Sequence, residues 1–186
     1  ISSLARIPDG VSDADAAAIA FGGATAQWFL RDRAEVTRGD TVLVIGATGA
    51  VGSAAVQLAA HAGAEVTAVG SASNADLARR LGAAHHIDYT RTPVASIRER
   101  FDIVIDTTGT IDRAAGLRLL APGGRLALVA ASLGDVIRAR RPVIVGTSPE
   151  RGDDVATLLE LVARGELDPL TTVVGVVEAW PGDHQL

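Results

Sequence analysis

The chain contains no cysteine, no lysine and no methionine among its 186 residues. The absence of cysteine excludes disulfide bonds and zinc sites built on thiolates, and it is typical of a cytoplasmic protein. All 17 basic residues are therefore arginine. Two explanations of this bias are open: a genome rich in G and C, or modified lysines and methionines left out of the printed sequence.

Aromatic residues are also scarce, at 3%, and there is no excess of positive charge. The formal net charge is −5, and most arginines are scattered along the chain, which argues against a nucleic-acid partner and fits an ordinary soluble protein. With 48% hydrophobic residues, the chain can bury roughly 70% of its unfolded surface in one domain. It has no signal peptide and no linker rich in Pro, Gly or Ser, and Ile1 in place of methionine predicts that further sequence precedes it.

Residues 41–62 carry the strongest pattern in the chain. The apolar run 42–45 is short and β-branched, which is typical of a parallel strand buried on both faces. Ala47, Gly49 and Gly52 then occupy the three glycine positions of the GxGxxG fingerprint, with alanine at the first. An alanine-rich helix follows from Ala50, and its N-terminal N–H groups and dipole favour an anion. The stretch therefore predicts a dinucleotide-binding turn.

Two other interpretations of this stretch are open. In the first, the glycines serve only a tight connection between a strand and a helix. In the second, the stretch is a membrane span, because no charge falls between Asp40 and His61. Thr48, Ser53 and Gln57 interrupt the apolar run, however, and a buried parallel strand followed by its helix has the same composition. We therefore expect no membrane association.

The rest of the chain alternates between predicted helices and strands. Helices are expected over residues 13–20, 23–34, 74–82 and 112–120, and from Ser148 onward, with Ser73 opening the third of them as a capping box. Further strands are expected over residues 65–69, 86–89, 101–106, 125–130 and 143–145. This alternation predicts an α/β fold: a Rossmann-type, doubly wound parallel sheet of about six strands with helices on both faces.

The residues about 20 positions after the glycines bear on the choice of cofactor. Sites specific for NAD usually place Asp or Glu there, to bind the ribose 2′-hydroxyl. Residues 70–74 of this chain read Gly-Ser-Ala-Ser-Asn and contain no acid. Small hydroxyl and amide side chains can donate to a 2′-phosphate, so NADPH is favoured over NADH. The alternative is that Ser73 only caps its helix and the loop is small because it is tight.

Five ordered motifs together resemble one family: IPDGVS, GDTVLVIGATGAVGSAAVQLAAHAGAEV, LARRLGAAHHIDYT, DIVIDTTG and LLAPGGRLALV. Over residues 4–170 the chain resembles the cofactor domain of a medium-chain dehydrogenase/reductase, of the zinc-independent quinone oxidoreductase branch related to zeta-crystallin. The resemblance implies NADPH-dependent hydride transfer to a quinone or another α,β-unsaturated carbonyl, without a metal. Zinc-using relatives carry a ligand four residues before the threonine that corresponds to Thr25, and Phe21, which stands there, has no donor atom for zinc.

The resemblance also implies a set of cofactor-binding residues. Thr25 would contact the nicotinamide side, and Tyr89 would lie near the phosphate end of the adenosine. The pyrophosphate would be bound by Ala47, Thr48, Gly49, Ala50, Val51 and Gly52. The 2′-phosphate would be surrounded by Gly70, Ser71, Ser73 and Asn74. At the ligand-binding edge of the sheet, the adenosine end would be bordered by Thr108 and Gly109, and the nicotinamide end by Ala130 and Ala131.

The loop at residues 70–74 departs from the family, because many relatives place lysine or arginine beside the 2′-phosphate. Arg79, Arg80 and Arg91 are the cations that could compensate, although each can equally be a solvated surface residue. The chain is interpreted as a single NADP(H)-binding Rossmann domain over residues 1–186. Residues 1–22 would be a connector and helix from an N-terminal catalytic domain that the chain lacks.

Several alternatives stay open, because the catalytic half and the usual closing Gly-Lys strand are missing and GDHQL stands in place of that strand. An enoyl-thioester reductase of the same superfamily would share these motifs and differ in the acceptor pocket. A short-chain dehydrogenase would need the lysine of a YxxxK pair, which the chain lacks. A non-catalytic module that senses NADPH is a third possibility. No residue is assigned as a catalytic acid or base, and a homodimer through sheet edges is one expected assembly.

Overall fold

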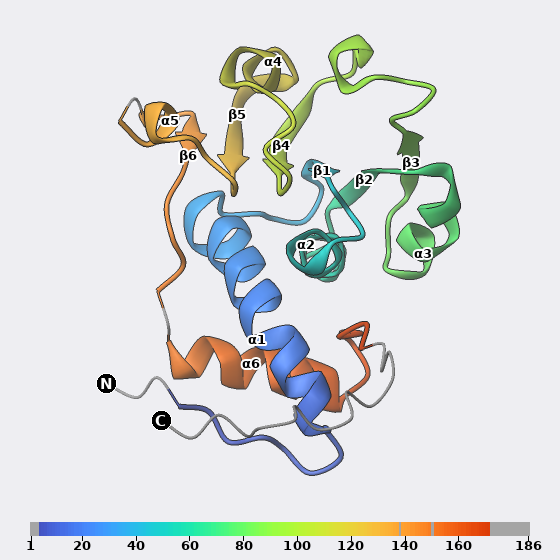
Figure 1. Ribbon diagram of the computed structural model, residues 1–186, viewed down its shortest axis with the longest axis vertical. Helices are drawn as coiled ribbons and strands as arrows, with labels where there is room; N and C mark the ends of the chain where they lie inside the picture. Colours follow the sequence, from blue (N-terminus) through green and yellow to red (C-terminus); the bar gives the residue numbers. More distant parts are fainter. Residues whose placement is uncertain (1–3, 138, 150, 172–186) are drawn as a thin grey trace, which may run out of the picture.

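A six-stranded parallel sheet organises the computed structural model, which describes residues 4–137, 139–149 and 151–171 (Figure 1). The strand order is β3-β2-β1-β4-β5-β6. From β1, the next two strands are added toward one edge of the sheet, and β4, β5 and β6 are added toward the other edge, so the strand order reverses between β1 and β4. This is the doubly wound order that the sequence predicts. The strands are β1 (Thr41–Ile45), β2 (Glu65–Gly70), β3 (His85–Asp88), β4 (Phe101–Asp106), β5 (Leu120–Leu128) and β6 (Val143–Ile144).

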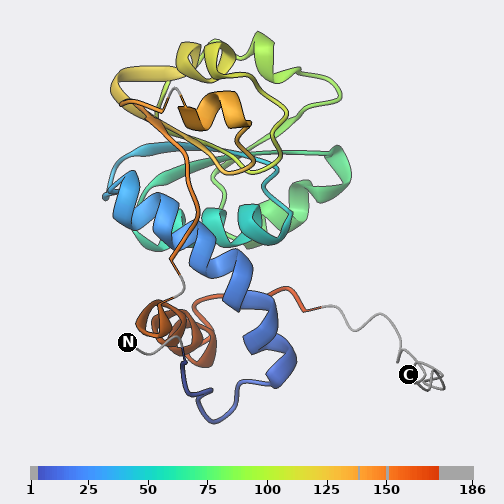
Figure 2. The same cartoon turned by 60° about the vertical axis from the view of Figure 1, so that its left-hand side comes forward.

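Helices cover both faces of the sheet, as Figure 2 shows. One face carries α1 (Asp13–Gln27), α2 (Ala50–His61) and α3 (Ala75–Arg80), and the other carries α4 (Arg113–Arg118) and α5 (Leu133–Ile137). The core is correspondingly divided into two clusters. Val42 and Val44 of β1 belong to the cluster shared with α1 and α2, while Leu43 and Ile45 belong to the other. All four are almost fully buried, because a central parallel strand has no solvent-facing side.

The N-terminal helix differs from the prediction of two helices over residues 13–20 and 23–34. Instead, α1 runs without a break to Gln27 and continues as a π-helical segment, η1 (Trp28–Arg33). A side-chain carbon on Gly22 would overlap the carbonyl group of Ala50, at the start of α2. Gly22 therefore allows α1 to cross close to α2. The interruption expected between residues 20 and 23 is therefore absent, and Gly22 serves the packing of two helices.

The fifth strand and the helices near it also differ from the prediction. Pro122-Gly123-Gly124 lies inside β5, where the register with β4 shifts, and does not precede the strand. The last described helix, α6 (Gly152–Ala163), begins four residues after Ser148, whose hydroxyl donates instead to the carbonyl of Ala24. The short helix α5 was not predicted. In each case the point at which a helix or strand begins depends on contacts with an element that is distant in the sequence.

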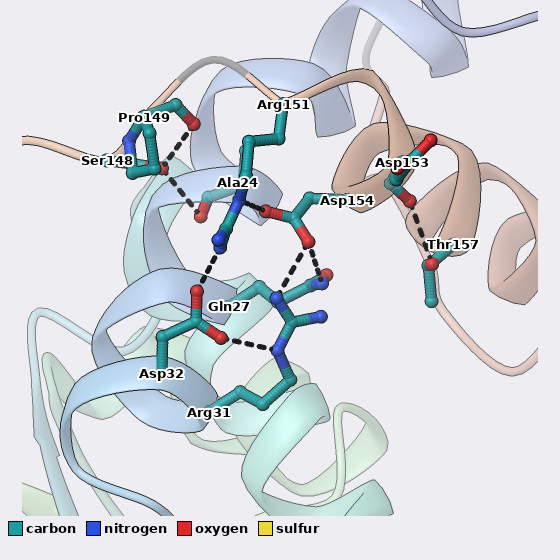
Figure 3. Close-up of polar contacts among 10 residues, drawn as sticks. All are labelled: Ala24, Gln27, Arg31, Asp32, Ser148, Pro149, Arg151, Asp153, Asp154 and Thr157. Carbon is teal, nitrogen blue, oxygen red and sulfur yellow. Dashed lines mark hydrogen bonds and ion pairs between the residues drawn. The ribbon is translucent and has the colours of Figure 1, made fainter. Parts of the chain in front are cut away.

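Polar contacts fasten α6 to the end of α1 and to η1 (Figure 3). The carboxylate of Asp154 accepts hydrogen bonds from Gln27 at 3.3 Å, Arg31 at 2.7 Å and Arg151 at 2.6 Å. Arg31 and Arg151 also bind Asp32, and these hydrogen bonds, that of Arg31 first, lower the pKa of Asp32 despite its partial burial. Segments more than 100 residues apart are thereby joined through alternating charges.

In the described part of the chain, no helix is both long enough and apolar enough to cross a bilayer. The interpretation of residues 41–62 as a membrane span is wrong, because this stretch folds as β1 followed by α2. The motif GDHQL lies outside the described residues.

Candidate dinucleotide-binding site

A cavity of about 1060 Å³ opens at the carboxyl ends of the central strands. It lies where the strand order reverses between β1 and β4, the place at which open α/β sheets bind their ligands. Its walls come from the glycine turn after β1, the loop after β2, the segment after β3 and the loop that leads from β4 into α4. Predicted site residues that line it are Thr48, Gly49, Ala50, Val51, Gly70, Ser71, Asn74, Tyr89 and Thr108.

The turn after β1 is shaped for close approach. Gly46 has a left-handed φ of +80°, and a side chain there would overlap Thr108. Gly49 is the N-cap of α2 and offers no capping side chain, so the first N–H groups of the helix are left for another acceptor. A side-chain carbon on Gly52 would overlap the carbonyl oxygen of Gly46. Of the predicted residues here, Ala47 and Gly52 form the structure behind the cavity wall rather than the wall itself.

The loop after β2 is held against this turn by one side-chain contact. The amide of Asn74 donates a 2.9 Å hydrogen bond to the hydroxyl of Thr48. The hydroxyls of Ser71 and Ser73 lie 2.9 Å apart and bond to each other. Asn74 precedes α3 without a side-chain capping bond, so the predicted capping box does not form. Ser73 is exposed and does not line the cavity, whereas Ser71 does.

Asp106, at the end of β4, organises the opposite wall. Its fully buried carboxylate accepts hydrogen bonds from the backbone of Thr108 at 2.9 Å, Gly109 at 3.2 Å and Ile111 at 3.2 Å. It also accepts one from the hydroxyl of Thr108 at 2.8 Å. These bonds fold residues 107–111 around one side chain. A side-chain carbon on Gly109 would lie 3.1 Å from the carbonyl oxygen of Ala130, and neither Gly109 nor Ala130 lines the cavity. Asp106 therefore has a structural role in this loop.

Part of the cavity wall was not predicted. The segment after β3 contributes Pro93, Val94 and Ala95, and the entry to α4 contributes Thr110, Ile111, Asp112, Ala115 and Arg118. Most of these residues are small or apolar and of kinds that occur in most loops, so no sequence signal separates them. Tyr89 is 53% exposed at the rim, and its N–H donates to the carbonyl of Gly70.

Thr25 lies apart from this cavity, in a second one of about 470 Å³ between α1 and residues 146–149. Phe21, one helical turn earlier, lines the same cavity and is 75% exposed. Val129 lines it as well, but Ala130 and Ala131 line neither of these two cavities. Among the described residues, no group of three or more His, Cys, Asp or Glu side chains could hold a metal ion.

The geometry fits a dinucleotide. A recessed cavity at the switch point, uncapped N–H groups at the start of α2 and glycines that keep side chains away together suit a pyrophosphate with a nucleoside on one side. The apolar wall formed by Val94, Ile111 and Ala115 suits an adenine ring.

Comparisons with known proteins agree with this geometry. A family model described as zinc-binding dehydrogenase matches residues 50–165. The chain is 40% identical to a mycocerosic acid synthase-like polyketide synthase of Mycobacterium tuberculosis, over 64% of this chain and 6% of that protein. It is 37% identical to erythronolide synthase EryA2 of Saccharopolyspora erythraea, over 95% of this chain and 5% of that protein. The chain thus spans a small fraction of these relatives.

Solved structures give the same picture at the level of the fold. The quinone oxidoreductase from Coxiella burnetii matches with a TM-score of 0.77 and 28% identity, over 88% of this chain and 53% of that chain. The CurF ER cyclopropanase from the curacin A biosynthetic pathway matches with a TM-score of 0.70 and 26% identity, over 87% of this chain and 54% of that chain. The chain therefore spans about half the length of these structures.

Proposed function

The chain belongs to the zinc-binding dehydrogenase family, as an NAD(P)-binding oxidoreductase domain of the medium-chain dehydrogenases/reductases, and we propose that it binds NADPH for the reduction of an enoyl thioester. The observation that carries this choice is the similarity to polyketide synthases. A 37% identity that extends over 95% of the chain falls within a synthase in which the match occupies 5% of the length. This is the arrangement expected of one reducing domain within a long multidomain enzyme.

The residues at the first cavity would hold the cofactor by its phosphates. The N–H groups at Ala50 and Val51 and the dipole of α2 would stabilise the pyrophosphate. Ser71 and Asn74 would donate hydrogen bonds to the 2′-phosphate of NADPH, and no carboxylate in residues 70–74 would repel it. Thr25 would lie on the nicotinamide side, in the second cavity.

When bound, NADPH would supply a hydride for the β-carbon of the enoyl thioester, and the α-carbon would take a proton from the solvent or from another group. The contribution of this chain is to fix the cofactor so that the nicotinamide meets the acceptor in one orientation. No acid or base is assigned among the residues described here. We further propose that no zinc takes part, because Phe21 offers no donor atom at the position where zinc-using relatives place a ligand.

Reduction of a quinone is the second candidate function. It is favoured by the similarity to the quinone oxidoreductase from Coxiella burnetii and by a second structure described as a quinone oxidoreductase, from Pseudomonas syringae, at 27% identity. Both acceptors are conjugated carbonyl compounds that take a hydride at carbon, so the cofactor domain would serve either one. The residues that determine specificity for an enoyl thioester or a quinone would line the acceptor pocket.

Steady-state kinetics with the complete protein test these proposals. NADPH oxidation is followed with crotonyl-N-acetylcysteamine and with 1,4-benzoquinone as acceptors. We expect kcat/KM for the thioester to exceed that for the quinone by at least about tenfold, or ~1.4 kcal/mol. The reverse ratio would select quinone reduction, and tight NADPH binding without turnover of either acceptor would indicate a binding module. NADPH should bind at least about tenfold more tightly than NADH, and a preference for NADH would overturn the cofactor proposal.

A further inference from the structure

His86 carries the one buried side-chain nitrogen that has no hydrogen-bond partner in the described part of the chain. It lies on β3, where it pairs with Ala68 of β2. Its Nε2 atom is 3.4 Å from the position that a side-chain carbon on Gly70 would occupy, and the Cβ atom of Asn74 is 3.9 Å from the same position. The imidazole therefore lies directly beneath the loop formed by residues 70–74.

The cations that the sequence offered for this loop are placed elsewhere. Arg79 forms an ion pair with Asp76 at 2.8 Å, and Arg91 lies 3.8 Å from Asp88. Arg80 lines a separate cavity beside His61. The loop itself contains no basic residue, and Arg118, which lines the first cavity, comes from α4 on the other face of the sheet. Among these side chains, His86 is the basic one beneath the loop.

A buried ring nitrogen without a partner is in an unfavourable state, because it has lost its hydrogen bond to water without gaining another. A phosphate group bound at the loop formed by residues 70–74 would place a negative charge near this nitrogen. Its negative charge favours the imidazolium form, and histidine is the side chain that gains a proton most readily near neutral pH. Gly70 keeps the space between the ring and the loop free of a side chain.

We propose that His86 selects for the 2′-phosphate: binding of NADPH transfers a proton from the solvent to the imidazole, and binding of NADH does not. This inference rests on the proposed use of NADPH. His86 acts as a positioning residue: its positive charge attracts the 2′-phosphate across the loop formed by residues 70–74. It donates no proton to the acceptor. The positive charge that residues 70–74 lack is thus supplied from beneath them, and it is present when the phosphate is present.

Other charged groups lie on β3, on the turn after it and on the elements packed against it. Asp88 and Arg91 follow on the same strand and turn, 3.8 Å apart, and hydrogen bonds from Thr90 lower the pKa of Asp88. On β2, Glu65 is bound by His85 at 2.9 Å. On α3, Asp76 and Arg79 bind each other beside Arg80. Each of these groups is present with either cofactor, so a comparison of NADPH with NADH isolates the effect of the 2′-phosphate.

The test measures how many protons the protein takes up when it binds each cofactor. Binding is followed by calorimetry at pH 7.5 in two buffers with different enthalpies of ionisation. At this pH the 2′-phosphate is already almost fully ionised, because the second pKa of such a group is about 6. The wild-type protein should take up a measurable fraction of a proton with NADPH and none with NADH. His86→Gln should abolish the uptake and weaken NADPH binding by about tenfold, with NADH binding unchanged. His85→Gln removes the exposed neighbouring histidine and should behave as the wild type.

Equal proton uptake with NADPH and NADH in the wild type overturns the inference without any variant. So does full uptake in His86→Gln, provided that its thermal unfolding midpoint shows a folded protein. A ring resonance of His86 that shifts to its protonated position on addition of NADPH supports the inference independently. Preference for NADH, or binding of neither cofactor, instead overturns the proposed use of NADPH, and the two failures are thereby told apart.

Discussion

A side-chain carbon on Gly52 would overlap the carbonyl oxygen of Gly46, six residues earlier on the other side of the turn. The first turn of α2 therefore packs backbone to backbone against the end of β1. Gly49, between them, is different: a side-chain carbon there would lie 3.5 Å from the same carbonyl oxygen, an ordinary contact distance. The two glycines of one fingerprint thus have separable roles, one in packing and one at the cavity.

The pair Gly52→Ala and Gly49→Ala tests this separation. Gly52→Ala should lower the free energy of unfolding by about 2 kcal/mol, because the turn must open to admit the methyl group. Gly49→Ala should change it by less than about 0.5 kcal/mol, since the backbone of Gly49 is extended at φ −79° and the added carbon would lie at an ordinary contact distance of 3.5 Å from the carbonyl oxygen of Gly46. It should nevertheless weaken NADPH binding by about tenfold, because Gly49 lines the cavity. Urea unfolding and calorimetry measure the two quantities.

Unchanged NADPH affinity in a folded Gly49→Ala protein would contradict the placement of the pyrophosphate at this turn. It would leave the interpretation that the glycines serve only the connection between β1 and α2.

Asp106→Asn tests the loop that forms the opposite wall. Oδ1 accepts from the N–H groups of Thr108 and Gly109, and Oδ2 accepts from the N–H of Ile111, so either orientation of an asparagine amide would place its NH₂ group against a donor. We expect a loss of about 2–3 kcal/mol in the free energy of unfolding, because Asp106 is fully buried. Asp112→Asn is the matched control: Asp112 caps α4 by accepting from Ala115, and asparagine caps helices about equally well. A stable Asp106→Asn protein would mean that the loop is held by other contacts.

The sequence predicted the centre of the fold, because two local features specify it. β1 and β4 are buried on both faces, so their apolar runs are continuous, and the glycine turn has a conformation that few other residues allow. The wall formed by Val94, Ile111 and Ala115 could not be predicted in this way, because only the fold brings these ordinary residues opposite the loop at 70–74. The same holds for Gly22, because only the fold brings it against the backbone of Ala50 at the start of α2.

Arg31 and Asp154 form the centre of the contacts that fasten α6 to η1 (Figure 3). Asp154→Ala should lower the free energy of unfolding by about 2 kcal/mol, because it leaves Gln27 and two arginines without their shared acceptor in a mostly buried place. Arg31→Ala should cost less, about 1 kcal/mol, since its side chain is 49% exposed. In a double-mutant cycle the two changes should couple by about 1 kcal/mol. Simple additivity would show that the ion pair contributes nothing beyond the separate side chains.

The pairing of Asp102 with Thr41 should appear in the dependence of stability on pH. The N–H of Thr41 donates to the Asp102 carboxylate at 2.9 Å and its hydroxyl donates at 2.8 Å, and these bonds lower the pKa of Asp102. A carboxyl group with a lowered pKa in the folded state stabilises the protein fully above its unfolded value, about 3.9. That contribution is lost as the pH falls from about 3.9 through the folded pKa.

Asp102→Asn removes this titration while keeping a side chain that can still accept from Thr41. The variant should therefore be less stable than the wild type by about 1 kcal/mol at pH 7, and the difference should shrink as the pH falls below about 4. Asp15, Asp32 and Asp88 also have lowered pKa values, but they titrate in both proteins and cancel in the difference. Urea unfolding of the two proteins between pH 3 and 7 measures it. A difference that stays constant across this range would show that ionisation of Asp102 does not strengthen the connection between the starts of β1 and β4.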